Sequence, residues 1–346
     1  MKSTTKTVLD TEIIQKIMEK HFGEVQVQNV TELTEGWFNA IYVVEYTKGD
    51  EETTVVLKTG VETGKYVLTY EKNLMQAELQ VYDLLQDTII PTADILARDF
   101  SHDVIDCDYF IMEYLTGDNW GHLDASLIPE NRDLLVAELA EYTAALHQIK
   151  GKWFGYLKDD AFYQYPTWRE AFQGMVQMMI DDGKAQNLDL PYDELLAALE
   201  PYLYLMDDIQ EPCLVNFDMW TKNIMLKKKE DEVYYHIDAI IDLERAFYGD
   251  PKADFISSNT VVGDVSTCQN FMDHYSKISG KEFTYTQRDR VRHAMYWLYL
   301  IIMGGVEVYR KTDEQERAEA LQGCRDGLKQ FTEVLKEAAA KLEEEF

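Results

Sequence analysis

The chain has 346 residues, which is enough for two domains or for one bilobal unit with a large core. Hydrophobic side chains make up 46% of it, so the composition excludes wholesale disorder. The 63 acidic side chains outnumber the 33 basic ones and give a formal net charge of −30, and we therefore expect neither a nucleic acid nor an anionic membrane as a partner.

The first hundred or so residues predict a small mixed α/β unit. A helix is expected over residues 9–22, ended by Gly23, and three β-rich runs follow it, "VQVQNVTEL", "AIYVVEY" and "TTVVLKT". Their alternating pattern and β-branched residues predict an antiparallel meander. Apolar residues at helical spacing from Leu74 to Leu85 predict a longer helix. Two short strands, near Ile95 and at "YFIMEYL", complete the unit.

The rest of the chain predicts a mainly helical unit. Helices are expected over residues 132–147, 168–182 and 192–206 and over two long stretches from about residue 286 onward. Two β-like segments, "CLVNF…NIML" and "VYYHIDAIID", interrupt them and predict a loop-bearing hairpin. The sequence thus predicts an α+β, bilobal fold, with a β-rich N-terminal lobe over residues 1–113 and a helical C-terminal lobe over residues 114–346.

Several features predict a cytoplasmic protein. The four cysteines, Cys107, Cys213, Cys268 and Cys324, lie far apart and have no partner at zinc-ligand spacing, which predicts buried free thiols in a reducing compartment. The first twenty residues have charges every few positions and no apolar run of signal-peptide length. The apolar stretch at residues 294–305 is too short to span a bilayer and predicts a buried helix.

The stretch "LVNFDMWTKNIML" carries an aspartate and an asparagine, Asp218 and Asn223, separated by four residues. This is the D-x-x-x-x-N spacing of a protein-kinase catalytic loop, in which the aspartate accepts the substrate hydroxyl proton and the asparagine holds Mg²⁺. Both residue types are also common in turns, so the spacing alone leaves a polar turn as the alternative. Nineteen residues after Asn223, an apolar run ends in Asp242, which is placed to be the second metal ligand.

The N-terminal unit supplies candidates for holding a nucleotide. Lys58 ends the third β-rich run in "VVLKT", where its ammonium group could reach phosphates. Glu78 is the expected ion-pair partner of Lys58 because it lies among inward-facing apolar residues of the next helix, and Glu71 is the rival. Gly36, in "TEGWFNA", would let a loop backbone approach phosphates, although the same stretch also fits an ordinary hairpin turn.

The paired stretches "NFDMWTKNIML" and "IIDLERAFYGDPKADF" resemble the signature of the aminoglycoside phosphotransferase family, small-molecule kinases with a protein-kinase-like fold. The stretches "AELQVYDLL", "YFIMEYLTGD" and "AALHQIKGKWFGY" are also similar to that family. The resemblance spans roughly residues 30–260. It implies ATP or GTP with Mg²⁺, an adenine held by the backbone between Glu113 and Leu115, and Asp218 as catalytic base.

The chain departs from that family's pattern next to the candidate base. The family has His-Gly before its catalytic aspartate, whereas this chain has Asn216 and Phe217. Asparagine could replace the hydrogen bonds of a loop-organising histidine, but phenylalanine is a less easy exchange for glycine. A nucleotide-binding pseudokinase with decayed catalysis is therefore kept as the alternative.

The resemblance implies a small-molecule alcohol as acceptor of the phosphoryl group. An aminoglycoside or a related aminated sugar is preferred, and a cationic acceptor would suit the net charge of the chain. Macrolides, choline, methylthioribose and fructosamines stay open as acceptors, because no motif in the helical half reports what binds there.

Overall fold

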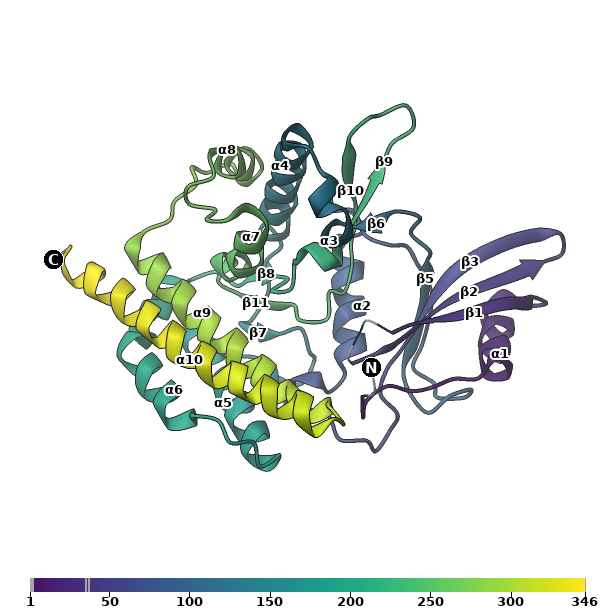
Figure 1. The fold of residues 1–346 in the computed structure, drawn as a ribbon, viewed down its shortest axis with the longest axis horizontal. Coiled ribbons are helices and arrows are strands. Elements are labelled where there is room, and N and C mark those ends of the chain that lie inside the picture. The colour runs from purple at the N-terminus through teal and green to yellow at the C-terminus, as the bar shows by residue number, and fades with distance from the viewer. Residues whose placement is uncertain (1–2, 35, 37, 346) are drawn as a thin grey trace. The chain divides into compact units, whose positions relative to one another are not determined.

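The computed structural model describes residues 3–34, 36 and 38–345. The chain divides into two compact units, whose elements are labelled in Figure 1. Unit 1 comprises Met1–Val67, Ala93–Thr116 and Tyr309–Arg317, and unit 2 comprises Leu68–Thr92, Gly117–Val308 and Ala318–Phe346.

Unit 1 is built on a five-stranded antiparallel sheet with the strand order β1-β2-β3-β5-β4. Its elements are α1 (Thr11–Phe22), β1 (Gln26–Leu33), β2 (Ala40–Lys48), β3 (Glu51–Thr59), β4 (Ile95–Asp99) and β5 (Tyr109–Glu113). The expected meander is therefore confirmed as β1-β2-β3, and β5 and β4 extend it at the β3 edge.

Helix α1 covers one face of this sheet because its apolar residues recur at helical spacing. Ile14, Ile17 and Met18 are fully buried and share one core with Val44 and Leu57 of the strands. The helix begins after Asp10, whose side chain accepts a hydrogen bond from the Ile13 amide at 2.8 Å. Gly23 ends it at a φ of 80°, a conformation that glycine adopts without strain.

Unit 2 is mainly helical. Its α-helices are α2 (Leu74–Leu85), α3 (Trp120–Leu123), α4 (Pro129–Leu146), α5 (Trp168–Ala185), α6 (Tyr192–Leu199), α7 (Phe255–Val262), α8 (Gln269–Ser279), α9 (Gln287–Val306) and α10 (Glu314–Glu343), the last of which begins in unit 1. Its 3₁₀ turns are η1 (Thr69–Glu71), η2 (Asp124–Ser126), η3 (Ala161–Tyr163), η4 (Glu200–Asp208), η5 (Thr221–Asn223) and η6 (Pro251–Asp254), and η7 (Glu307–Arg310) follows α9.

Two small antiparallel sheets frame the loop that carries Asp218. The strands of unit 2 are β6 (Asp118–Asn119), β7 (Gly155–Tyr156), β8 (Cys213–Val215), β9 (Ile224–Lys228), β10 (Tyr235–Ile240) and β11 (Phe247–Gly249), in the orders β10-β9-β6 and β7-β11-β8. Strands β9 and β10 form a hairpin, whereas β8 pairs with β11 in the other sheet. The loop between β8 and β9 thus connects two sheets.

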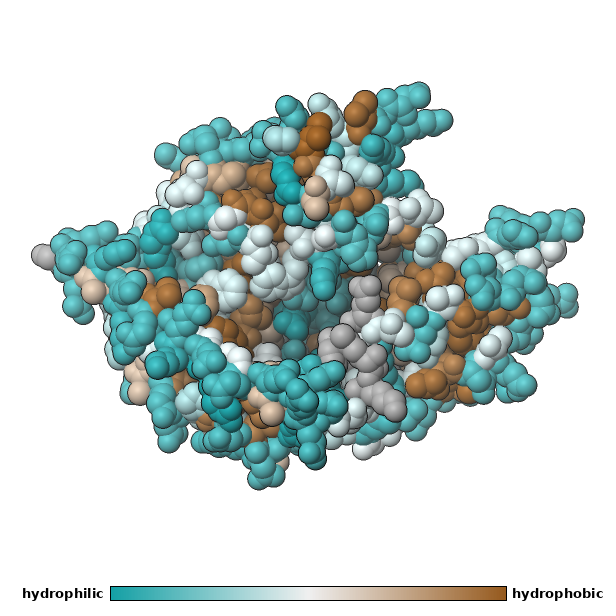
Figure 2. All heavy atoms as spheres, viewed as in Figure 1, coloured by the Kyte–Doolittle hydropathy of each residue, from teal (hydrophilic) through white to brown (hydrophobic). Residues whose placement is uncertain are grey.

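The two longest helices, α9 and α10, lie side by side and antiparallel (Figure 1). The Gln287 side chain donates to the Ala338 carbonyl at 2.7 Å near one end of the pair, and Trp297 stacks on Phe331 with ring centroids 4.9 Å apart further along. Helix α9 contains residues 294–305, so the expectation of a buried helix there is confirmed. In Figure 2, hydrophilic residues, coloured teal, cover most of the visible face.

Some expected elements differ from the structure. The helix expected over residues 192–206 ends at Leu199, and a 3₁₀ segment continues to Asp208, because Pro201 lacks an amide proton and its ring clashes with the preceding turn of an α-helix. Helices α7 and α8 were not predicted. They are short, and the aromatic cluster that stabilises them, with Phe255 and Phe271 at its centre, forms only in the folded chain.

The predictions about thiols and membrane spans can be compared directly with the structure. All four cysteines are free, and Cys107, Cys213 and Cys324 are buried while Cys268 is half-buried. Within the described ranges, no helix is both long and apolar enough to cross a bilayer.

We predict that Arg292→Met lowers the free energy of unfolding by about 3–5 kcal/mol, because it leaves the buried Asp250 carboxylate without its counter-ion. The Arg292 side chain is 5% exposed, its Nε lies 2.9 Å from Asp250 and it also binds Asp289. Arg325→Met, which removes an exposed pair with Asp189, is the control and should cost only about 0–1 kcal/mol. Urea denaturation measures both, and equal effects would contradict the prediction.

Candidate active site

The backbone of the Asp218 loop, residues 216–223, is fixed by side-chain acceptors. The buried Asp254 carboxylate accepts hydrogen bonds from the amides of Asn216 and Phe217, at 3.1 and 2.6 Å. The amide of Asp218 donates to the side-chain oxygen of Asn216 at 2.9 Å. His147 also binds the Asp254 carboxylate, through Nε2 at 3.0 Å. Three consecutive amides are thereby paired, which holds the loop in one conformation.

Phe217 has the left-handed backbone conformation that favours glycine, with a φ of 64°. Its side chain is 2% exposed, and its ring lies 5.2 Å from that of Phe247 and 5.7 Å from that of Tyr299. Burial of the ring offsets the backbone strain. The loop therefore takes a glycine-like turn while its side chain joins the core of unit 2.

The Asp218 carboxylate is oriented by groups on two sides. Asn223 donates through Nδ2 to Oδ2 at 3.1 Å and to the Asp218 carbonyl at 2.9 Å, and the indole of Trp220 donates to Oδ1. Arg245 lies with one guanidinium nitrogen 3.7 Å from Oδ1. Burial raises the pKa of the Asp218 carboxyl, the Arg245 charge opposes that rise, and the Asp242 carboxylate adds to it.

Three carboxylates of unit 2 lie close together, one from helix α2 and two from the segment that follows strand β10. Oxygen atoms of Glu78, Asp242 and Glu244 all lie within 4.8 Å of one another. Asp242 has a φ of 61°, and the amide of Ile241 donates to the Asn223 carbonyl at 2.9 Å, which ties this segment to the Asp218 loop. Carboxylate and amide oxygens are the ligands of hard cations, so this donor set fits Mg²⁺.

The structure places Glu244 and Glu78 beside Asp242, one of the predicted metal ligands. The sequence contains a signal for Glu244, because Glu244 follows Asp242 in the pattern D-x-E. The carboxylate of Glu71, the rival of Glu78, accepts the Leu68 amide at 2.8 Å beside the 3₁₀ turn η1. The pairing of Glu78 with Lys58 stays a prediction.

The predicted nucleotide-binding residues of unit 1 lie on or beside its sheet. Lys58 is 4% exposed and sits in β3 opposite Ile41 of β2 and Phe110 of β5. Glu113 ends β5, where its amide donates to the Asp94 carbonyl at 2.9 Å. The chain then leaves the sheet through Leu115, which is half-buried.

Gly36 lies in the connection between β1 and β2. Among the residues that the structure describes, a Cβ atom at this position would meet only the Asn39 carbonyl oxygen, at 3.8 Å. Its neighbours in "TEGWFNA", residues 35 and 37, lie outside the described residues.

A second set of charged residues continues from Arg245 and was not predicted. Arg245 donates to both carboxylate oxygens of Glu307, at 3.2 and 3.1 Å, and the hydroxyl of Tyr70 donates to the same carboxylate. The Tyr70 carbonyl accepts from the buried Lys158. Burial lowers the pKa of Lys158 to about 7, against the attraction of Glu71. No sequence pattern joins these residues, because they come from distant parts of the chain.

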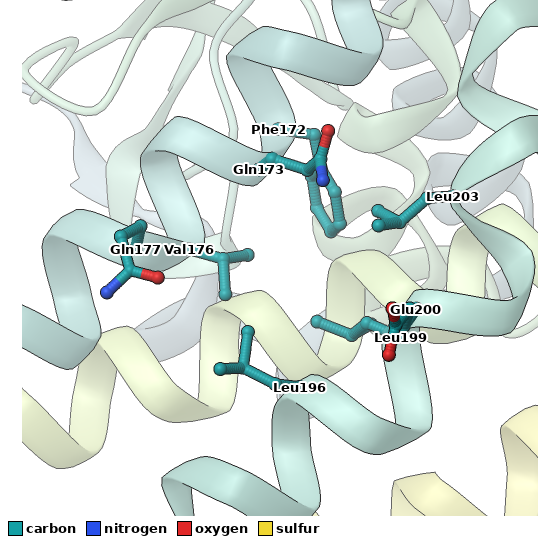
Figure 3. Close-up of a pocket in the computed structure, with 8 residues that line it drawn as sticks. All are labelled: Phe172, Gln173, Val176, Gln177, Leu196, Leu199, Glu200 and Leu203. Carbon is teal, nitrogen blue, oxygen red and sulfur yellow. The ribbon is translucent and has the colours of Figure 1, made fainter.

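A pocket of about 290 Å³ opens between α5 and the α6–η4 segment (Figure 3). Its lining is mainly apolar, with two glutamines and one glutamate, and consists of Phe172, Gln173, Val176, Gln177, Leu196, Leu199, Glu200 and Leu203. None of the predicted site residues is among them. Phe172 belongs to the aromatic stretch "FYQYPTWREAF", and its ring also packs 6.1 Å from that of Tyr299, so it contributes to core packing as well.

Comparison with known proteins gives one family and one fold. The sequence profile described as the phosphotransferase enzyme family matches residues 29–271. The chain matches no protein of a curated sequence set.

Three solved structures with similar folds are aminoglycoside phosphotransferases. A complex of a thermostable APH(4)-Ia mutant with AMP-PNP and hygromycin B has a TM-score of 0.60 and 17% identity, covering 93% of this chain and 98% of that one. The streptomycin–ATP complex of APH(2")-IIa has a TM-score of 0.58 and 15% identity, covering 95% of this chain and 99% of that one. ADP-bound APH(2'')-Ib has a TM-score of 0.56 and 16% identity, covering 94% of this chain and 99% of that one. These likenesses confirm the expected protein-kinase-like fold.

We predict that Phe217→Gly lowers the free energy of unfolding by about 1–4 kcal/mol. Glycine relieves a left-handed strain of about 1–2 kcal/mol, but loss of a buried aromatic ring costs about 3–5 kcal/mol, so packing dominates. Urea denaturation measures the change, with Phe162→Ala as the control because that ring is 56% exposed. A Phe217→Gly variant more stable than wild type would mean that strain dominates.

Proposed function

Because the chain belongs to the phosphotransferase enzyme family, we propose that it transfers the γ-phosphoryl group of ATP or GTP to a hydroxyl group of a small molecule. The observation that carries this proposal is the Asp218 loop. Its carboxylate is held by Asn223 and Trp220, next to a set of acidic residues suited to a divalent cation. Phosphoryl transfer depends mainly on such positioning and on charge stabilisation.

Each proposed residue has a separate task in this reaction. Asp218 accepts the proton of the acceptor hydroxyl and holds that oxygen in line with the phosphorus atom. Lys58 binds the phosphates, and the backbone from Glu113 to Leu115 binds the nucleotide base. Asp242 and Asn223 would hold Mg²⁺, which supplies positive charge to the phosphate oxygens when bound. Asn223 is well suited to this because its amide nitrogen is already used on Asp218, which directs the side chain.

The departure from His-Gly before Asp218 is compatible with an active enzyme. Asn216 supplies the acceptor for the Asp218 amide, so asparagine has an organising role in the loop. Phe217 adopts the backbone conformation of a glycine. Neither exchange removes a group that the proposed reaction requires.

The proposed acceptor is an aminoglycoside or a related aminated sugar. The fold neighbours were crystallised with streptomycin and hygromycin B, and the charge of −30 favours a cationic acceptor. The deciding experiment measures ATP and GTP consumption against aminoglycosides, macrolides, choline, methylthioribose and fructosamines. Acceptor-dependent turnover supports the proposal, and the absence of turnover with every acceptor would favour the pseudokinase.

We predict that Asp218→Asn lowers kcat by at least about 10²-fold, the scale of lost general-base help, while the fold and nucleotide affinity are retained. Steady-state kinetics with the acceptor found in that panel measures kcat, and calorimetry measures nucleotide affinity. Asp273→Asn, an exposed change on α8, is the matched control and should leave kcat unchanged. Undiminished phosphorylation by Asp218→Asn would refute the assignment of the base.

We predict that Lys58→Ala weakens ATP binding, because it removes the cation that faces the phosphates. Calorimetry with Mg·ATP measures the affinity, and Lys48→Ala on the exposed end of β2 is the control. An affinity equal to that of wild type would move the phosphate site away from Lys58.

We also predict that Asp242→Ala reduces the Mg²⁺ dependence of nucleotide binding, because it removes a charged ligand and leaves the neutral Asn223 with the Glu78 and Glu244 carboxylates. Nucleotide titrations with and without Mg²⁺ measure this dependence. Asp238→Ala, on the same strand β10, is the control. An Mg²⁺ dependence in Asp242→Ala equal to that of wild type would contradict the metal assignment.

A further inference from the structure

Arg245 connects the candidate base to a second carboxylate. One of its terminal nitrogens lies 3.7 Å from Oδ1 of Asp218, and the other lies 3.2 and 3.1 Å from the two carboxylate oxygens of Glu307. The side chains of Arg245, Asp218 and Glu307 are 21%, 11% and 13% exposed. Solvent therefore screens these contacts less than it screens an ion pair on the open surface.

Glu307 holds Arg245 from a rigid part of unit 2. It is the first residue after α9, whose last turn includes the buried Met303 and Val306. The hydroxyl of Tyr70 donates to the Glu307 carboxylate, and Tyr70 itself is buried and stacks on the ring of Tyr156 at 6.0 Å. The carboxylate that anchors the guanidinium is thus itself fixed by packing and by a hydrogen bond.

The three groups that contact the Asp218 side chain differ in origin. Trp220 and Asn223 belong to the Asp218 loop, and both are neutral donors. Arg245 comes from the segment after β10 and carries a full charge. It therefore adds a charged contact from outside the loop to the ring contact of Trp220 with Trp297 of α9, at 6.5 Å, and the hydrogen bond from the Ile241 amide to the Asn223 carbonyl.

An arginine suits this position better than a lysine. The guanidinium is planar and presents several N–H groups in a fixed fork, so one side chain can face two carboxylates at once. A lysine ammonium is a point charge on a flexible stem, and it would face one carboxylate well and the other poorly.

We propose that Arg245, anchored by Glu307, is a positioning residue that holds the Asp218 carboxylate in line with the acceptor hydroxyl. The inference rests on the proposed function, because it assumes that Asp218 is the base. A base that is misplaced by about 1 Å can cost about 10²-fold in rate, so a contact of this kind matters for turnover without contributing to nucleotide binding.

The test compares Arg245→Met, Arg245→Lys and Glu307→Gln in turnover of the best acceptor from the panel and in calorimetric binding of Mg·ATP. We expect Arg245→Met to lower kcat by about 10–10²-fold with unchanged nucleotide affinity and nucleotide KM. Arg245→Lys should lie between Arg245→Met and wild type. Glu307→Gln should have a smaller effect than Arg245→Met, because the guanidinium is still present. Arg325→Met, which removes the exposed ion pair of Arg325 with Asp189 in unit 2, should leave kcat unchanged.

Chemical rescue separates positioning from general structural support. Millimolar guanidinium chloride should restore part of the kcat of Arg245→Ala, because the ion can occupy the space of the lost group, and should not restore Asp218→Asn. Full kcat in Arg245→Met would overturn the inference. Parallel losses of kcat and nucleotide affinity in the Arg245 variants, with no rescue by guanidinium, would also overturn the inference, because they would indicate a merely structural role.

Failure of this inference differs from failure of the proposed function. If wild type turns over and Asp218→Asn does not, full activity of Arg245→Met overturns only the role of Arg245. If wild type shows no turnover with any acceptor, the proposed function fails and the role of Arg245 fails with it.

Discussion

The arrangement of the candidate site depends on one buried carboxylate, that of Asp254. It accepts two consecutive amides of the Asp218 loop and the imidazole of His147, and it is fully buried. A buried amide without an acceptor costs about 1–3 kcal/mol, so the loop has few other conformations of similar energy. Because Asp254 ends the 3₁₀ turn η6 and His147 follows α4, this contact ties the loop to both elements. The position of Asp218 therefore depends on Asp254 and His147, which lie outside the Asp218 loop.

The groups around Asp218 divide into a local and a distant set. The local set, Asn216, Trp220 and Asn223, lies within the loop and gives the carboxylate its immediate hydrogen bonds. The distant set reaches the loop through Arg245 and Glu307. The charges link the local and the distant set. Asp218, Asp242 and Glu307 are all acidic, and Arg245 lies between Asp218 and Glu307. A cation at the Asp242 carboxylate would complete the charge balance.

The sequence predicted the elements whose patterns are local. The meander of unit 1 follows from alternating residues, and α2 and α9 follow from helical spacing, while Asp218, Asn223 and Asp242 were selected by their spacing together with the apolar runs around them. Contacts between distant segments left no such signal. Arg245 and Glu307 are 62 residues apart along the chain, and the grouping of Glu78 with Asp242 and Glu244 depends on how α2 packs. The split of the helix at Pro201 also has a local cause, because proline lacks the amide proton that the helix requires.

The burial of Phe217 also has a consequence for how the chain opens. Its ring is part of the same aromatic packing as Phe247 and Tyr299, while its amide is bound to Asp254. Active-site loops commonly open by themselves at low cost in free energy. Here the amides of Phe217 and Asp218 can reach solvent only when the ring leaves the helical core. Hydrogen exchange at these two amides should consequently follow the slow opening of α9, so that the loop and the core form one cooperative unit.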